Sequence, residues 1–146
     1  MSRVINPNAP GKERNRLKRG VALSLRELIR ESEPNAKTRD LAAFIALSLD
    51  AIIKTVDTTV AAWEKRDYWL KADRFRRDWE WTERLGAEMR TAVLADDWAG
   101  VAQAAVQIVQ KLSDVKISER HRMGAPWVGA WERLQDLTVE QPTHQN

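Results

Sequence analysis

The stretch from Leu41 to Trp63 constrains the fold more than any other part of the sequence. Apolar side chains recur there at spacings of four and three residues, which is the repeat of one face of an α-helix. Further apolar residues widen that face until only a narrow polar strip remains, formed by Asp50, Lys54, Asp57 and Glu64. A helix that is apolar on most sides is covered on most sides. The pattern therefore predicts a buried central helix over about residues 38–66.

Helices are also predicted on both sides of this central segment. Pro10 and Pro34 bound a helix over about residues 10–31, because proline fits the first turn of a helix and disfavours helix in the residue before it. After the central segment, helical spacing continues without a Gly or Pro until Gly86. One unbroken helix to residue 94 would be about 84 Å long at 1.5 Å per residue, too long for a small domain to cover. We therefore expect a break or kink near Asp67.

The last third of the chain predicts two shorter helices. Asp96 and Asp97 are helix-capping residues, and they precede a helix over about residues 98–112. Pro126 precedes a second helix over about residues 127–137. No run alternates between apolar and polar residues as a strand does. The predicted fold class is therefore all-α: a compact four- to five-helix bundle around the buried central helix.

The length of 146 residues is typical of one domain. We predict a single helical domain over residues 10–137, with a flexible N-terminal arm over 1–9 and a disordered tail over 138–146. The longest nearly apolar run, Leu41 to Leu49, is far shorter than the about 20 residues of a membrane span, and no signal-peptide pattern opens the chain. We therefore expect a cytoplasmic protein with no membrane contact, and the lack of cysteine fits a reducing compartment.

The residues that catalysis or metal binding needs are scarce. The chain has two histidines, His121 in a predicted connection and His144 near the end, and it has no cysteine. It lacks the Glu-x-x-His pairs that hold metals in helical bundles, and the single glycine of Pro10-Gly11-Lys12 does not make a phosphate-binding loop. We therefore expect no enzyme activity, no cofactor and no metal, so that the function is binding.

Positive charge is concentrated at the front of the chain, where residues 1–30 hold eight Lys and Arg against two Glu. On a helical wheel, the leucines of the predicted helix lie on one side and five cations lie opposite. This basic row consists of Lys12, Arg16, Arg19, Arg26 and Arg30. Such a row binds phosphate backbones, so it is a candidate surface for DNA or RNA. The alternative is an ordinary solvated face, and Leu23, which falls on the same side, would suit a protein partner better.

Tryptophan makes up seven of the ten aromatic residues, and four of the seven fall in residues 63–81 among Lys and Arg. Aromatic rings among cations can stack on the bases of single-stranded nucleic acid. Trp63, Phe75 and Trp79 lie on the apolar stripes, however, and are predicted to be core. Trp69 and Trp81 fall off the stripe, so they either pack a second layer of the bundle or form an exposed anchor patch for a partner.

The predicted helix over 98–112 is unusual because no residue from Trp98 to Gln110 is charged, in a chain that is 31% charged. One face is apolar and predicted to be core, and the other carries Gln103, Gln107 and Gln110. Protein interfaces are depleted of charge at their centres. The composition therefore favours self-association, or docking to a larger partner, through this helix.

Two functions remain open on these observations. The leading hypothesis is a non-enzymatic helical interaction subunit that contributes the basic row to a nucleic-acid or ribonucleoprotein complex. The alternative is a homo-oligomeric or adaptor module that binds protein through helix 98–112 and exposed Trp residues, with Trp69 and Trp81 as candidates. The predicted partner is DNA or RNA in the first case, and a second copy or a larger protein in the second.

Overall fold

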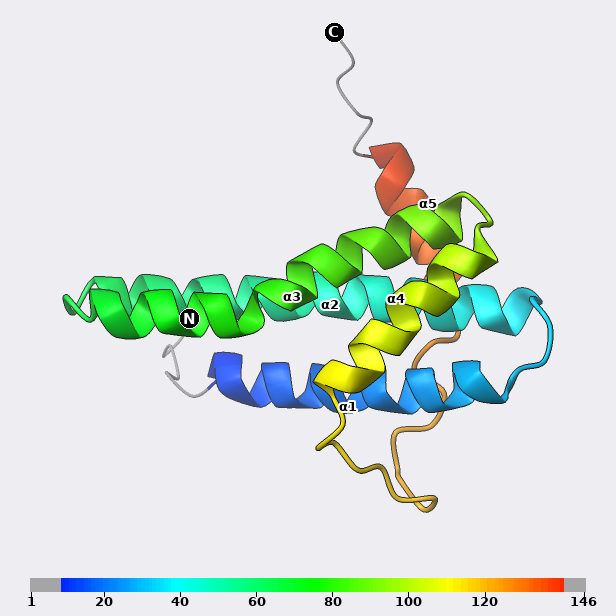
Figure 1. Ribbon diagram of the computed structural model, residues 1–146, viewed down its shortest axis with the longest axis horizontal. Coiled ribbons are helices and arrows are strands. Elements are labelled where there is room, and N and C mark those ends of the chain that lie inside the picture. The colour runs from blue at the N-terminus through cyan, green and yellow to red at the C-terminus, as the bar shows by residue number, and fades with distance from the viewer. Residues whose placement is uncertain (1–8, 141–146) are drawn as a thin grey trace, which may run out of the picture.

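The computed structural model describes residues 9–140 of the chain, and every regular element in that range is an α-helix (Figure 1). The five helices are α1 (Ala9–Arg30), α2 (Ala36–Glu64), α3 (Trp69–Leu94), α4 (Trp98–Lys111) and α5 (Ala130–Glu140). The predicted all-α class and helical bundle are confirmed. Most of the predicted arm and tail lies outside the described residues, although α5 continues three residues past the expected end at 137.

The central helix of the bundle is α2, as its pattern predicts. A capping box fixes its start: the Asn35 side chain accepts a hydrogen bond from the Thr38 backbone N–H, and the Thr38 hydroxyl accepts one from the Asn35 N–H. Helices α1, α3 and α5 all pack against α2. Even successive residues, such as Leu41 to Ala43, are buried. Since successive residues point to different sides of a helix, α2 is covered on most of its circumference.

The predicted break lies at Asp67. Its φ of 62° is in the left-handed region, which Asp enters more readily than most residues. The Tyr68 N–H donates to the Trp63 carbonyl oxygen at 2.9 Å, and α3 then returns along α2 (Figure 1). The two helices approach closely at Gly86, where a β-carbon would lie 3.1 Å from Cβ of Leu49. The predicted break is therefore confirmed, and α2 and α3 form a long hairpin.

The end of this hairpin next to Asp67 extends beyond α1 (Figure 1). Apolar side chains around Val60 form a small cluster there, separate from the main core. The rings of Trp63, Phe75 and Trp79 pack against this cluster, and each is half-buried. These three residues therefore border the core, whereas the sequence predicted them to be part of it.

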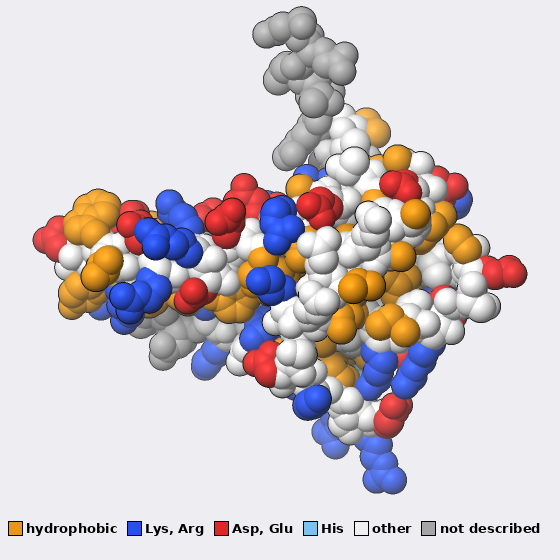
Figure 2. Space-filling view, in the orientation of Figure 1, with side chains coloured by type: hydrophobic (Ala, Val, Ile, Leu, Met, Phe, Trp, Pro, Cys, Tyr) orange, Lys and Arg blue, Asp and Glu red, His pale blue; other side chains and the backbone are white. Residues whose placement is uncertain are grey.

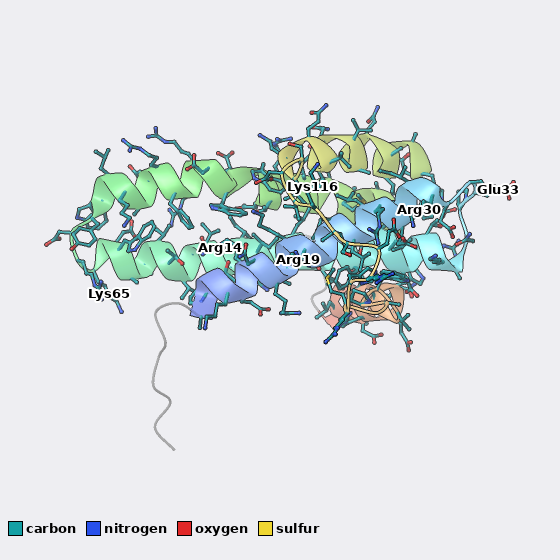
Figure 3. The ribbon with its side chains drawn as sticks, turned by 90° about the horizontal axis from the view of Figure 1, so that it is seen from below. Arg14, Arg19, Arg30, Glu33, Lys65 and Lys116 are labelled. Carbon is teal, nitrogen blue, oxygen red and sulfur yellow. The ribbon has the colours of Figure 1, made fainter. Side chains whose placement is uncertain are left out.

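Arg14 joins α1 to the hairpin. Its guanidinium lies 4.8 Å from the centroid of the Phe75 ring and 5.5 Å from that of Trp79. It also donates hydrogen bonds to the hydroxyl oxygens of Thr59, at 2.9 Å, and Thr55, at 3.2 Å. Figure 3 shows Arg14 where α1 crosses the hairpin. Burial lowers the pKa of Arg14, but a guanidinium keeps its charge at neutral pH.

The chain between α4 and α5 is irregular, and it crosses α1 before α5 begins (Figure 3). The last helix was expected from Trp127, but this residue lies in a turn, and Gly129, with a φ of 82°, precedes the first residue of α5. Asp40 of α2 accepts a hydrogen bond at 2.9 Å from the Trp131 N–H. That bond satisfies one of the unpaired donors at the start of α5. The helix begins later than predicted because the φ of Gly129 is incompatible with a right-handed helix.

Candidate protein-docking groove

An apolar groove lies between α4 and the end of α1. It is a hollow of about 610 Å³ lined by Leu28 and Ile29 of α1, by residues 31–34, by Thr38 of α2 and by one side of α4, which runs from buried Val101 to exposed Val106 and Val109. Figure 2 shows hydrophobic side chains gathered over α4 and beside it. We call this feature the α1–α4 groove.

The start of α4 is fixed by local hydrogen bonds. The Asp97 side chain accepts a hydrogen bond from the Gly100 N–H at 3.0 Å, as expected of a capping residue. Asp96 adopts a φ of 56° and accepts a hydrogen bond from the Trp98 indole at 2.8 Å. At Gly100 a β-carbon would lie 2.6 Å from Oδ2 of Asp97, so glycine leaves room for the cap. These contacts turn the chain sharply from α3 into α4 and set the direction of the groove wall.

The two faces of α4 have different environments. The inner face, which includes Val101 and Ile108, is buried in the main core. The outer face has no charged residue between Trp98 and Gln110, and its largest exposed hydrophobic side chains are Val106, which is 59% exposed, and Val109. The exposed residues of this outer face are Ala99, Ala102, Gln103, Val106, Val109 and Gln110. An apolar, uncharged and solvent-exposed surface of this kind has the composition of an interface core.

The opposite wall of the groove comes from the end of α1 and the turn that follows. Ile29 projects from α1 with 66% of its surface exposed. Glu31 and Glu33 line the same wall and give it negative charge. An ion pair between Arg39 and Asp96, at 3.6 Å, holds the start of α2 beside the start of α4. The acidic part of the wall therefore lies next to the N-terminal end of α4.

The basic row on α1 is not the continuous cationic surface that the sequence predicted. Arg16 donates to the Glu13 carboxylate, which raises the pKa of Arg16 and lowers that of Glu13. Arg30 forms ion pairs with Glu27, at 3.2 Å, and with Glu119, at 3.1 Å. Arg30 and, more weakly, Arg26 hold the pKa of Glu119 below its usual range. Arg26 also lies 3.8 Å from the Glu27 carboxylate and 4.0 Å from that of Glu119, so three of the five cations have carboxylate partners.

Arg26 is the clearest correction within the row. Its side chain is 22% exposed and donates to the Ile117 carbonyl oxygen at 2.9 Å. The segment between α4 and α5 thus covers this part of α1. Lys12 and Arg19 are exposed, and within residues 9–140 neither has an ion-pair partner. The row was predicted from one helix alone, and the covering segment comes from about 90 residues further along the chain.

The same segment explains Leu23, which the sequence placed on the basic side of α1. Leu23 is fully buried against Leu41 and Trp127, with Ile117 and Met123 packed around them. Its partner is therefore another part of this chain. A foreign protein is not needed to cover it.

The two off-stripe tryptophans have different environments. Trp81 is buried in the main core and stacks on Trp79 with ring centroids 6.3 Å apart. The prediction that Trp81 belongs to a protein interface is therefore wrong, because its side chain is already covered within the main core, and the second-layer alternative holds for Trp81. Trp69 is 57% exposed beside Tyr68 and Leu70, at the end of the hairpin and far from α4. The candidates Trp69 and helix α4 therefore do not form one surface.

The three glutamines of α4 that were predicted to lie in an interface are mostly at the surface. Gln103 and Gln110 are exposed. Gln107 is half-buried, and its side-chain oxygen accepts a hydrogen bond from Arg84 at 3.4 Å. Gln107 therefore faces α3 at the edge of the outer face, while Gln103 and Gln110 are available to a partner.

Two residues of the binding and packing surfaces were not predicted from the sequence. Ile29 was not singled out, although an isoleucine next to Arg30 at the end of a helix is a signal of an apolar contact beyond that helix. Arg14 was not singled out either, yet on the helical wheel it falls about 60° from Leu17, on the apolar side. A cation on that side of an amphipathic helix indicates a buried, hydrogen-bonded role.

No protein-family model, no curated protein and no solved structure matches this chain. Within residues 9–140, no three His, Asp or Glu side chains lie close enough together to hold a metal ion. Among the helices of that range, none has the length and apolar character that crossing a membrane requires. The function is therefore argued from the geometry of the α1–α4 groove.

Proposed function

We propose that this chain is a non-enzymatic helical module that docks a helical protein segment in the α1–α4 groove. The observation that best supports the proposal is the outer face of α4, where exposed valines border the groove without a charged residue between Trp98 and Gln110. Single apolar residues on a surface are common, whereas a group around one hollow is typical of a binding site.

The gain from covering the groove is substantial. Ile29, Val106 and Val109 all lie around the same hollow and are all exposed. Fully burying one side chain of this kind contributes about 1.5–3 kcal/mol. A helix that carries apolar residues at spacings of three and four can pack those residues into a hydrophobic groove. The proposed ligand is therefore an amphipathic helix of a protein.

The basic row gives less support to nucleic acid as the main ligand. Phosphates would compete with Glu13 for Arg16, and with Glu27 and Glu119 for Arg30. Arg26 would have to leave the Ile117 carbonyl. Binding of DNA or RNA thus stays a prediction that rests mainly on Lys12 and Arg19.

The contacts of His121 support the non-enzymatic part of the proposal. Its Nδ1 accepts a hydrogen bond from the Met123 N–H at 3.2 Å within the segment between α4 and α5. This is the contact of a residue that stabilises a turn, and His144 lies outside the described residues. A cytoplasmic location is part of the same proposal, because a chain without cysteine suits a reducing compartment.

Site-specific photo-crosslinking in the protein's own cells tests the proposal. Benzoylphenylalanine in place of Val106 should form a covalent adduct with a protein, and Val109→Glu in the same chain should reduce its yield about tenfold, as loss of a central interface contact does. The matched control is Val128, which is 70% exposed but lies outside the groove. If Val106 forms no adduct, or if adducts at Val106 and Val128 are equally abundant, the groove is not a docking site.

A further inference from the structure

We infer that the ligand of the α1–α4 groove is a second copy of this chain, bound through antiparallel pairing of the two α4 helices. This inference rests on the proposed function, since it names the partner of the same surface. It is carried by three properties of α4: the spacing of its exposed apolar residues, the placement of its glutamines and the distribution of charge at its two ends.

The exposed apolar residues follow a two-helix packing pattern. Ala99, Ala102, Val106 and Val109 are separated by three, four and three residues. All four are exposed, so no segment within residues 9–140 covers this row. The same alternation of three and four forms the contact line of paired helices, in which side chains of one helix fit between those of the other. The outer face of α4 therefore has the pattern of a helix whose partner is another helix.

The pattern is compatible with a copy of itself. In an antiparallel pair whose two-fold axis passes between Val106 and Val109, Val106 of each copy packs against Val109 of the other. Gln103 of one copy then lies within about 3 Å, along the helix axis, of Gln110 of the other, given a rise of 1.5 Å per residue. Two side-chain amides at that position can exchange hydrogen bonds. A two-fold axis repeats each of these contacts twice, as in most homodimers.

The charges at the two ends of α4 favour the antiparallel direction. Glu31 and Glu33 lie beside its N-terminal end, while Lys111 and Lys116 outnumber Asp114 at and after its C-terminal end. Antiparallel pairing brings each acidic end near the basic end of the other copy. Parallel pairing would place like charges side by side. The charge-free stretch between the ends introduces no repulsion in either direction.

Sedimentation equilibrium of the full chain tests the inference by measuring its molecular mass from about 1 to about 200 µM. This range covers the weak association expected of a small interface. We expect a reversible dimer with twice the monomer mass of 16.7 kDa. Val106→Glu should weaken the dimer at least tenfold, because it places carboxylates in the apolar contact, and Val128→Glu should leave it unchanged. Circular dichroism should show equal helix content for both variants, since both positions are exposed.

Disulfide trapping tests the pairing direction independently of any loss of binding, because the natural chain has no cysteine. A mixture of Gln103→Cys and Gln110→Cys chains should form the mixed disulfide, whereas either chain alone should not. In the antiparallel pair the two copies of position 103 are about 13 Å apart along the helix and the two copies of position 110 about 7.5 Å apart, both beyond disulfide reach.

A monomer at every concentration would overturn the second-copy inference, while an adduct between Val106 and a different protein would preserve the docking function. A dimer that Val106→Glu does not weaken would also overturn the inference, since it would use another surface. Disulfides formed by each variant alone, at position 103 or 110, would exclude the antiparallel pairing. Absence of any adduct at Val106 removes the proposed function itself.

Discussion

The Arg14 guanidinium contacts both helices of the hairpin, so replacing Arg14 should lower the stability of the whole fold. Arg14→Met removes its hydrogen bonds to Thr59 and Thr55 and its contact with the Phe75 and Trp79 rings. Hydrogen bonds from a charged group contribute about 1.5–3 kcal/mol and a cation–π contact about 1 kcal/mol, and restoring the solvation of the cation offsets part of this. We expect the free energy of unfolding in urea to fall by about 2 kcal/mol.

Arg19 provides the matched control, because it is an exposed arginine on the same helix. Arg19→Met should change the free energy of unfolding by less than about 0.5 kcal/mol. Arg14→Lys should fall between the two, since an ammonium cannot reach both threonines and lie across two rings as a planar guanidinium does. Equal losses at Arg14 and Arg19 would mean that the contacts of Arg14 do not stabilise the fold.

At Asp67 the backbone conformation restricts which residue types the position accepts. Its φ of 62° costs most residues with a side chain about 1–2 kcal/mol and Asp less, and a branched β-carbon raises that cost. We expect Asp67→Val to lower the free energy of unfolding by about 1–2 kcal/mol, and Asp67→Gly to leave it within about 0.5 kcal/mol. At Lys65, whose φ is −62°, the order should reverse, because there glycine is the less favourable residue. Thermal unfolding of the four variants checks both orders.

At the scale of elements, the segment between α4 and α5 is attached to α1 by charge. Glu119 is exposed and pairs with Arg30 and Arg26, and its pKa is lowered first by the hydrogen bond from Arg30 and then by the two positive charges. A lowered pKa in the folded state means that the pairing stabilises the attachment above the usual carboxyl range near 4.5 and is lost as pH falls through the lowered value. We therefore expect the segment to loosen as the pH falls below the usual carboxyl range.

Nuclear magnetic resonance measures this loosening residue by residue. The backbone amide signals of residues 117–121 should shift between pH 6 and pH 3, while those of the α2 core stay in place. In Glu119→Gln these signals should lie at pH 7 where those of the natural chain lie at pH 3. Glu33→Gln changes an exposed glutamate outside these ion pairs, and its signals at pH 7 should match those of the natural chain. If Glu119→Gln matches the natural chain at pH 7, another contact holds the segment to α1.

The positions of the helices could largely be predicted from the sequence. Which segments of the chain bury which side chains could not. Spacing within Leu41–Trp63 predicted the central helix, and the excessive length of a continuous rod predicted the break at Asp67. Both depend on local pattern or on chain dimensions. The burial of Leu23 and Arg26 depends on Ile117, about 90 residues away, and no periodicity within α1 contains that information. Likewise, the uncharged composition of α4 indicated an interaction surface, but Ile29 joins it only through the fold.

For the whole molecule, the remaining question is whether a net charge of +3 is enough to bind nucleic acid. The logarithm of the binding constant should fall against the logarithm of salt concentration with a slope of about −0.9 for each phosphate contact. Lys12 and Arg19 alone predict a slope of about −2, whereas all five residues of the basic row would give about −4.5. Because the other three cations have partners in the fold, we expect the shallow slope and weak binding, measured by fluorescence anisotropy with duplex and single-stranded probes.

Charge-reversal variants connect that slope to particular residues. Lys12→Glu with Arg19→Glu should abolish the remaining binding, because these exposed cations have no ion-pair partner within residues 9–140. Lys65→Glu with Arg66→Glu changes the net charge equally at the far end of the hairpin, and it should reduce binding only as far as net charge acts at long range. A slope near −4.5 would show that nucleic acid displaces Glu13, Glu27 and Glu119 from their arginines. The basic row would then be the principal binding surface, and the α1–α4 groove would serve assembly of the bound complex.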